Sequence, residues 1–301
     1  MSKMKGTSIK RGRATLTFNI IGYLFVGIMA LICLMPFIIM ISGSFSSEMA
    51  IRLQGYSIFP REFTLEAYKT VFKFPEKIIR AYGVSILITA VGTSVGLFVL
   101  TMGAYVISRK DFKYRNVVSF FLYFTTLFNG GMVSTYIFFI QYLHLKDNLL
   151  ALIFPGMLSI FNLLIMRSFV SNIPTALIES AKIDGASEFK IFIRIIIPLL
   201  KSGLATIGLF MALTYWNDWH NAMLYMNTAE KFPLQYMLYD MLNQAQALAR
   251  IAAQAGIQVE SLPTNTLKLA MAVVATGPIV LLYPFVQKYF VKGITVGSVK
   301  G

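Results

Sequence analysis

Charged residues are scarce in this chain. Only 13% of its 301 residues are Asp, Glu, Lys or Arg, whereas 56% are hydrophobic and the mean hydropathy is +0.67. A soluble domain carries about 25% charged residues, because charge is what covers a surface that faces water. The shortage therefore excludes a soluble globular enzyme, a disordered chain and a collagen-like chain.

Histidine and cysteine are almost absent. The chain has two His and one Cys, and Cys33 lies inside an apolar run. One cysteine cannot form an internal disulfide, and so few ligands argue against a structural zinc site or a Cys–His catalytic pair. The sequence also lacks the G-x-x-x-x-G-K-[ST] phosphate loop. We therefore expect no cofactor, no metal ion and no catalytic site in this chain.

What the chain does contain is long stretches without a single Asp, Glu, Lys or Arg. A bilayer core about 30 Å thick needs roughly 20 helical residues, and five of the six stretches meet or approach that length. The stretch at 202–217 has only 16 residues, so we expect its helix to continue through Asp218 and His220 towards Met226. The sequence thus predicts an all-α integral membrane protein with six transmembrane helices. The stretches are Ala14–Ser47, Ala81–Ser108, Asn116–Leu145, Asn148–Met166, Ser202–Asn217 and Leu269–Gln287.

The net charge of +14 is unevenly divided between the two sides of these helices. On one side the connecting segments carry 17 Lys and Arg against 4 acids, and on the other side 10 against 9. Basic residues remain in the cytoplasm, so the charge indicates orientation rather than nucleic-acid binding. We expect a multi-pass protein of the cell membrane with both termini in the cytoplasm. A basic cytoplasmic N-terminus at 1–15 would precede a single transmembrane domain at 16–301.

Two outer loops follow from this topology. The loop 218–268 contains a stretch rich in helix formers, and we expect Gln235–Gln258 to form a helix over the outer mouth. The loop 48–80 carries charges of both signs, which predicts a solvated segment with short helices. Inside the second span, Gly92 and Gly96 form a small-xxx-small pair that favours close contact between helices.

The cytoplasmic loop 167–201 predicts a helix, a turn and a second helix. Proline suits the first turn of a helix, so the first helix begins near Pro174. Asp184-Gly185 marks the turn, and Ser187 is a suitable N-cap for a second helix that runs to the region of Pro198. By periodicity alone, an ordinary amphipathic connector explains the same pattern.

The residues of this loop resemble the cytoplasmic signature of ABC importer permeases. That signature reads Glu-Ala-Ala, three residues, Gly, nine residues, Ile, one residue and Leu-Pro, and every spacing matches here. The departures are Ser180 for the second Ala and Ile197 for Leu. The strings IPTALIESAKIDGAS and YPFVQKYFVKGITVGSVKG resemble the carbohydrate branch, of the maltose-permease kind. The string FPLQYMLYDML resembles the LplC-like oligosaccharide or polysaccharide group within that branch.

This resemblance implies the ABC type I importer fold and a transporter built from several subunits with separate functions. The chain would pair with a second, related permease and receive a carbohydrate from an extracellular solute-binding protein. A cytoplasmic ATPase dimer would bind and hydrolyse ATP, and the loop at 174–198 would fit a groove on it as a coupling helix. The coupling residues carried over from the signature and its turn are Glu179, Ser180, Ala181, Asp184, Gly185, Ala186, Ile195 and Pro198.

A second cluster lies where the 202–217 stretch ends. Ionisable residues at membrane depth are candidate functional sites, and aromatic rings beside amides and acids suit sugars. Helical spacing would place Asn217 and Asn221 on one face. Three interpretations remain open: an interfacial anchor, a gate or outer-mouth contact, and a direct contact with sugar. The residues concerned are Tyr215, Trp216, Asn217, Asp218, Trp219 and Asn221.

Two other classes of function compete with an importer subunit. An integral-membrane enzyme would need converging carboxylates or a metal set, but apart from Asp218 the six spans hold no acid. A stand-alone secondary transporter would usually show buried relay residues and inverted repeats, and the sequence shows neither. The sequence therefore favours a permease subunit that depends on partners.

Overall fold

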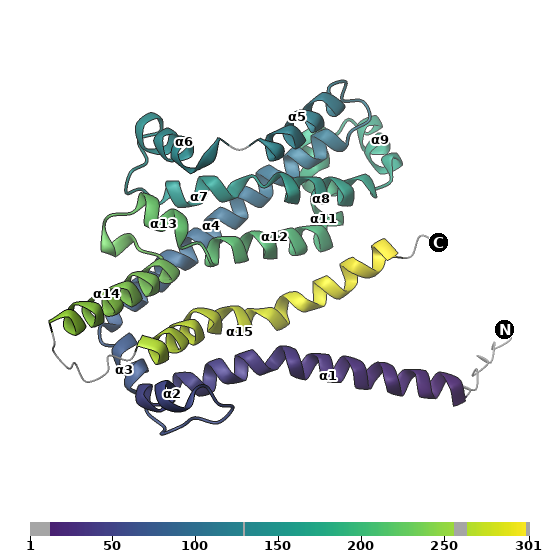
Figure 1. Cartoon of the computed structure of the whole chain (residues 1–301). Coiled ribbons are helices and arrows are strands. Elements are labelled where there is room, and N and C mark those ends of the chain that lie inside the picture. Colours follow the sequence, from purple (N-terminus) through teal and green to yellow (C-terminus); the bar gives the residue numbers. More distant parts are fainter. Residues whose placement is uncertain (1–12, 129, 256–263, 299–301) are drawn as a thin grey trace. The chain divides into compact units, whose positions relative to one another are not determined.

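The computed structural model describes residues 13–128, 130–255 and 264–298 (Figure 1). All regular elements in this part of the chain are helices, which confirms the all-α fold class. They form two compact units, which are residues 1–71 with 249–273 and residues 72–248 with 274–301. Most of the predicted basic N-terminus and residues 256–263 of the predicted outer loop lie outside the described residues. The single permease domain at 16–301 stays a prediction.

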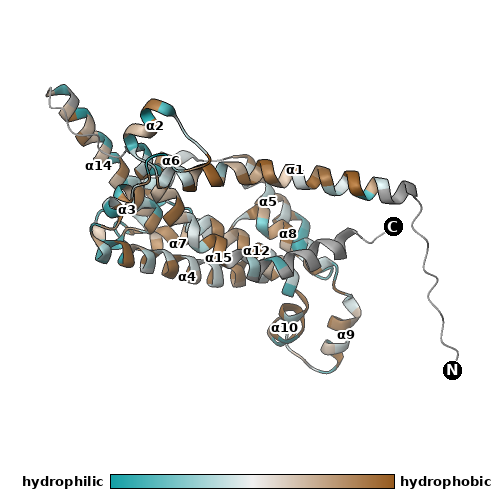
Figure 2. Ribbon diagram, turned by 90° about the horizontal axis from the view of Figure 1, so that it is seen from below, coloured by the Kyte–Doolittle hydropathy of each residue, from teal (hydrophilic) through white to brown (hydrophobic). Residues whose placement is uncertain are grey.

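The first unit contains the long helix α1 (Arg13–Ser44), with α2 (Glu48–Gln54), α3 (Glu66–Val71) and the beginning of α15 (Thr264–Ser298). Large apolar side chains such as those of Phe18, Leu24 and Phe37 are exposed along α1. Figure 2 shows this helix as predominantly hydrophobic. Apolar surface on this scale suits a helix that is covered by lipid or by another transmembrane subunit.

Glu48 corrects the expectation that the loop 48–80 is simply solvated. Glu48 is only 5% exposed. Its carboxylate accepts hydrogen bonds from the backbone N–H groups of Asn265 (3.0 Å) and Thr266 (2.9 Å). These are free N–H groups of the first turn of α15. Arg52 also donates to Glu48, at 3.0 Å. Burial opposes ionisation, but the hydrogen bonds from Thr266, Asn265 and Arg52 prevail, so the pKa of Glu48 is lowered.

The second unit is built around α4 (Pro75–Ser108), which packs against α7 (Leu150–Met157), α8 (Ile160–Ser171) and α12 (Lys201–Trp216). Leu100, Met166 and Ile207 are fully buried in the core between these helices. The core therefore lies along one face of α4, while Ile86, Val95 and Val106 are exposed on the other face. In Figure 1, α9 (Thr175–Ile183) and α13 (His220–Tyr225) lie towards opposite ends of α4.

Glycines let the helices of this core approach closely. A Cβ on Gly92 of α4 would lie 2.5 Å from the ring of Tyr215, and one on Gly156 of α7 would lie 2.7 Å from the same ring. The hydroxyl of Tyr215 donates to the carbonyl of Ile153 at 2.7 Å. A Cβ on Gly96 would meet Met211 at 2.5 Å. The close helix contact predicted from the glycine pair is confirmed.

Three described helical stretches are long and apolar enough to span a membrane: Thr17–Ser44, Pro75–Ser108 and Thr264–Leu281. Three further candidates are helix pairs that are sharply bent at a short break. If each bent pair is one span, the total is six, in agreement with the sequence. The pairs are Arg115–Leu127 with Gly131–Tyr142, Leu150–Met157 with Ile160–Ser171 (50°), and Glu188–Leu199 with Lys201–Trp216 (84°).

The expected extension of the 202–217 helix towards Met226 is wrong. The helix α12 ends at Trp216, and the chain turns before α13 begins at His220. The missing length lies on the other side, in the bent segment that precedes Lys201. Asp218 stands in the turn because its carboxylate accepts from the backbone N–H of Asn221 at 3.0 Å, which satisfies a free donor of α13.

The remaining helices connect these parts. The predicted helix at 235–258 is confirmed as α14, up to its last described helical residue, Gln254. The other elements are α5 (Arg115–Leu127), α6 (Gly131–Ile137), η1 (Phe138–Tyr142), α10 (Glu188–Ile191), η2 (Phe192–Ile196), α11 (Ile197–Leu199), η3 (Ala229–Lys231) and α14 (Leu234–Gln254).

Candidate functional site

The loop 167–201 forms the predicted helix, turn and helix. The first helix, α9, begins directly after Pro174. It ends in a left-handed glycine, since Gly185 has a φ of +75°. The N–H of Gly185 donates to the carbonyl of Lys182 (3.0 Å), and that of Ala186 donates to the carbonyl of Ala181 (2.9 Å). This paired arrangement is a Schellman ending, which closes a helix tightly and favours glycine at the left-handed position.

The second arm begins where the sequence places it. The side chain of Ser187 accepts from the backbone N–H of Lys190 at 3.4 Å and caps α10. The chain then continues through the π-helical turn η2 and α11 up to Leu199. Ile191, Phe192 and Ile196 are buried along this arm. The second arm is therefore fixed in the core, and Figure 2 shows α9 and α10 beside each other at the end of that arm.

Near the turn, each arm has large apolar side chains that no part of this chain covers. Ile183 is 87% exposed and Phe189, after the turn, is 62% exposed. Large apolar side chains with this exposure beside charged ones are typical of a surface that another protein covers. Of the predicted coupling residues, Glu179, Ser180, Asp184, Gly185 and Pro198 are exposed, Ala186 and Ile195 are half-buried, and Ala181 is buried.

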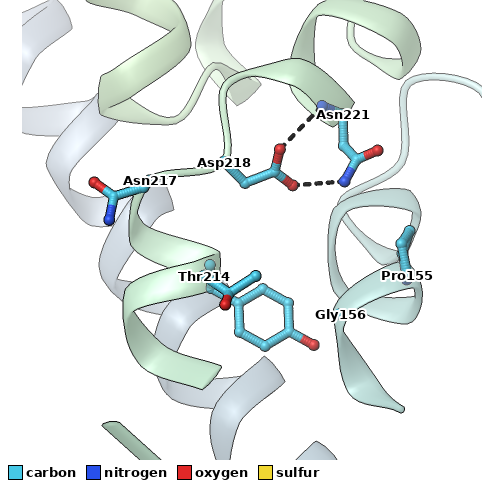
Figure 3. A pocket seen from close by; sticks show the side chains of 7 residues that line it. Pro155, Gly156, Thr214, Asn217, Asp218 and Asn221 are labelled. Carbon is cyan, nitrogen blue, oxygen red and sulfur yellow. Dashed lines mark hydrogen bonds between the residues drawn. The ribbon is translucent and has the colours of Figure 1, made fainter. Parts of the chain in front are cut away.

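A pocket of about 240 Å³ lies where α12 ends, beside Gly156 of α7. Figure 3 shows Asp218 and Asn221 facing each other, with the amide Nδ2 of Asn221 donating to Asp218 at 2.7 Å. Asn217 points away from that pair, so the expectation that Asn217 and Asn221 share one helical face is wrong. The helix breaks between them. The pocket is lined by Pro155, Gly156, Thr214, Tyr215, Asn217, Asp218 and Asn221.

The aromatic residues of this cluster have three different environments. Tyr215 is buried between the two glycines described above. Trp216 is also buried, and its indole N–H donates to the carbonyl of Ala275 in α15 at 3.0 Å. A buried, hydrogen-bonded Trp216 is not an interfacial anchor. Trp219 is 37% exposed, and its ring packs on that of Tyr239, with 4.5 Å between the ring centroids.

Sequence reasoning missed the side chain that fixes the chain beyond α13. Asp147 accepts from Lys231 Nζ (2.8 Å) and from the backbone N–H groups of Asn227 and Thr228 (both 3.0 Å). The hydrogen bond from Lys231 is the main reason that the pKa of Asp147 lies below its usual range. This network joins the ends of two loops that are about 80 residues apart in sequence. The only signal at Asp147 was a short charged loop, which did not reveal a partner.

No family model matches the chain. The protein LplC of Bacillus subtilis is 42% identical over 294 residues, which cover 97% of each chain. The polygalacturonan/rhamnogalacturonan transport system permease protein YtcP of the same organism is 39% identical and covers 94% of this chain and 98% of its own. The trehalose/maltose transport system permease MalG of Thermococcus litoralis is 31% identical, with coverage of 91% and 94%.

A solved structure agrees with these relatives. A chain in the crystal structure of a bacterial ABC transporter that imports the acidic polysaccharide alginate superposes with a TM-score of 0.75. It is 31% identical, and the match covers 93% of this chain and 98% of that one. Sequence and structure are thus matched nearly from end to end, which decides against a stand-alone transporter or a membrane enzyme. The chain belongs to the permease subunits of ABC carbohydrate importers.

Proposed function

We propose that this chain forms half of a carbohydrate path through the cell membrane, together with a second, homologous permease. A cytoplasmic ATPase dimer supplies the energy and an extracellular solute-binding protein supplies the sugar. The relatives named above are permease proteins of transport systems, which supports a partnered role. In this proposal the chain itself contains no catalytic site, no cofactor and no metal ion.

The exposed helix–turn–helix carries the proposal that α9 couples this subunit to the ATPase. Its first arm presents Ile183 and Glu179 outward, while its second arm is anchored in the core through Phe192 and Ile196. A partner that moves α9 therefore also moves the anchored arm and the helices packed on it. Rigid-body transmission of this kind is a common way to convert ligand binding into domain movement.

Replacement of Gly185 by valine tests this coupling. A Cβ at Gly185 would meet no atom of this chain within 4 Å, so its cost arises from the φ of +75°. A left-handed conformation costs a residue with a Cβ about 1–2 kcal/mol, which shifts an equilibrium about 5- to 30-fold. We expect Gly185→Val to reach the membrane at normal levels, to co-purify less ATPase and to lose sugar-stimulated ATP hydrolysis.

Gly83→Val is the matched control for this experiment. Gly83 lies in α4, has no left-handed φ, and a Cβ there would also meet nothing within 4 Å. Any general effect of replacing an exposed glycine with valine should appear in both variants. If Gly185→Val retained full ATPase binding and stimulation, the loop would be only a connector and the coupling proposal would fail.

We also propose that the pocket beside Asp218 contacts the sugar at the outer mouth. Its volume of about 240 Å³ is below the ~300–1,000 Å³ of sites for drug-sized ligands, so it suits one sugar unit rather than a chain. The hydroxyl of Thr214 and the carboxylate of Asp218 offer hydrogen-bond acceptors to sugar hydroxyls. The lining holds no Lys, Arg or His. The pocket therefore favours a neutral sugar unit over the carboxylate of an acidic one.

A further inference from the structure

Four side chains of alternating charge form a closed ring beside the coupling segment. Lys182 Nζ lies 2.7 Å from Glu188 Oε1 and 3.3 Å from Asp111 Oδ2. Arg109 completes the ring, since its Nη1 lies 3.2 Å from Glu188 Oε2 and its Nη2 donates to Asp111. Each cation therefore touches both anions, and the ring has no net charge.

The ring connects three parts of the fold that the turn alone would leave separate. Arg109 and Asp111 follow directly after the end of α4. Lys182 lies in the last turn of α9, and Glu188 is the first residue of α10. The pair of Lys182 and Glu188 thus spans the turn at Gly185, while their bonds to Arg109 and Asp111 attach both arms to α4.

A buried tyrosine anchors this ring to the core. The hydroxyl of Tyr105, in the last turns of α4, donates to Glu188 Oε2 at 2.9 Å, and Arg109 Nη1 donates to the same hydroxyl at 2.8 Å. The ring of Tyr105 packs on Phe192 of the second arm, with 5.7 Å between centroids. The Arg109 side chain is only 13% exposed. Arg109 is therefore the member of the ring that the core holds most closely.

Electrostatics agree with a fixed ring. The hydrogen bond from Arg109 is the main reason that the pKa of Asp111 lies well below its usual range. The pKa of Lys182 is raised, chiefly by its hydrogen bond to Glu188. The exposed fractions of Asp111 (59%) and Glu188 (55%) mean that each pair alone is weak. Because the four ion pairs form a closed ring, together they restrain α9, α10 and the end of α4 relative to one another.

We propose that this ring is a bracket that positions the coupling segment, so that α9, α10 and the end of α4 move as one body. Neither Lys182 nor Glu188 belongs to the spacing that marks the importer signature. In this proposal Lys182 and Glu188 are positioning residues. They hold the coupling segment in place, and the segment itself binds the ATPase. The proposal rests on the proposed coupling function of this loop.

Neutral replacements in the complete transporter test the bracket. Glu188→Gln removes the charge and keeps the size of the side chain, and Lys182→Gln removes the charge and shortens the side chain. We expect normal membrane levels and normal ATPase co-purification, because the docking face of α9 is unchanged. Sugar-stimulated ATP hydrolysis and sugar transported per ATP should each fall about fivefold, the change that corresponds to about 1 kcal/mol. Lys190→Gln is the matched control, since Lys190 is an exposed lysine of α10 outside the ring.

Charge reversal provides a second test in the same complex. Lys182→Glu with Glu188→Lys restores their own pair, but places like charges against Asp111 and Arg109. We expect this double variant to stay uncoupled, and addition of Arg109→Glu with Asp111→Arg to recover at least part of the stimulated activity. Recovery in the double variant alone would show that only the pair across the turn matters, which contradicts attachment to α4.

Two outcomes of the neutral variants would overturn the bracket. One is full stimulation and full transport per ATP in both variants. The other is a loss of ATPase co-purification in proportion to the loss of activity, which would make these residues docking contacts. Gly185→Val, measured in parallel, separates the two proposals. If it uncouples the complex while Glu188→Gln does not, the bracket fails and the coupling function stands.

Discussion

At the scale of single residues, Thr214 is the side chain that best tests the proposed sugar contact. It lines the pocket, and its hydroxyl donates to the carbonyl of Phe210 at 2.9 Å. The oxygen lone pairs thus remain to accept a hydrogen bond from sugar. We expect Thr214→Val to raise the KM for uptake by the reconstituted transporter about fivefold, since one hydrogen bond contributes about 1 kcal/mol. ATPase binding should not change.

Thr206 offers a closely matched control on the same helix. Its hydroxyl donates to the carbonyl of Ser202 at 2.9 Å, the same local bond as that of Thr214. It does not line the pocket. Thr206→Val therefore reports the effect of removing such a hydroxyl from α12 alone. Equal KM values for the two variants would show that the pocket does not contact the transported sugar.

At the scale of helices, α15 contains a break in its hydrogen bonding that a distant tyrosine repairs. Proline has no N–H, so Pro278 leaves the carbonyl of Val274 without its usual helical donor. The hydroxyl of Tyr82, from α4, donates to this carbonyl at 2.8 Å. Tyr82 of α4 thus supplies a hydrogen-bond donor to the carbonyl of Val274 in α15, which lacks a helical donor because of Pro278.

A double-mutant cycle tests this repair. Tyr82→Phe should lower the free energy of unfolding by about 1–3 kcal/mol, because it leaves the half-buried carbonyl of Val274 unpaired. Pro278→Ala restores an N–H, so the loss caused by Tyr82→Phe should be smaller in that background. Thermal unfolding of the four purified proteins in detergent measures both effects. An equal loss in both backgrounds would mean that Tyr82 does not compensate for the proline.

At the scale of the whole molecule, the sequence predicted the features that local residues determine. The turn at Gly185 and the cap at Ser187 were correct because proline, Asp-Gly and serine act on their immediate neighbours. The same reasoning failed at Trp216, where the end of the helix depends on Asp218 capping a following helix. It also missed Glu48, whose partner Thr266 lies 218 residues away. Contacts of that kind depend on packing, and one sequence alone does not show which distant residues meet.

Orientation in the membrane is the remaining property of the whole molecule that the charge distribution predicts. Because Cys33 is the only cysteine and lies in apolar α1, a single added cysteine in a Cys33→Ser background reports its own position. Ala247 of α14 and Lys110, just after α4, are both exposed. The excess of basic residues around the loop 109–115 predicts that this loop lies in the cytoplasm. A membrane-impermeant maleimide applied to intact cells should therefore label Ala247→Cys and reach Lys110→Cys only after the cells are opened.

Labelling of Lys110→Cys in intact cells, with Ala247→Cys protected, would reverse the topology. The exposed face of α9 would then lie outside, where no ATPase could bind it.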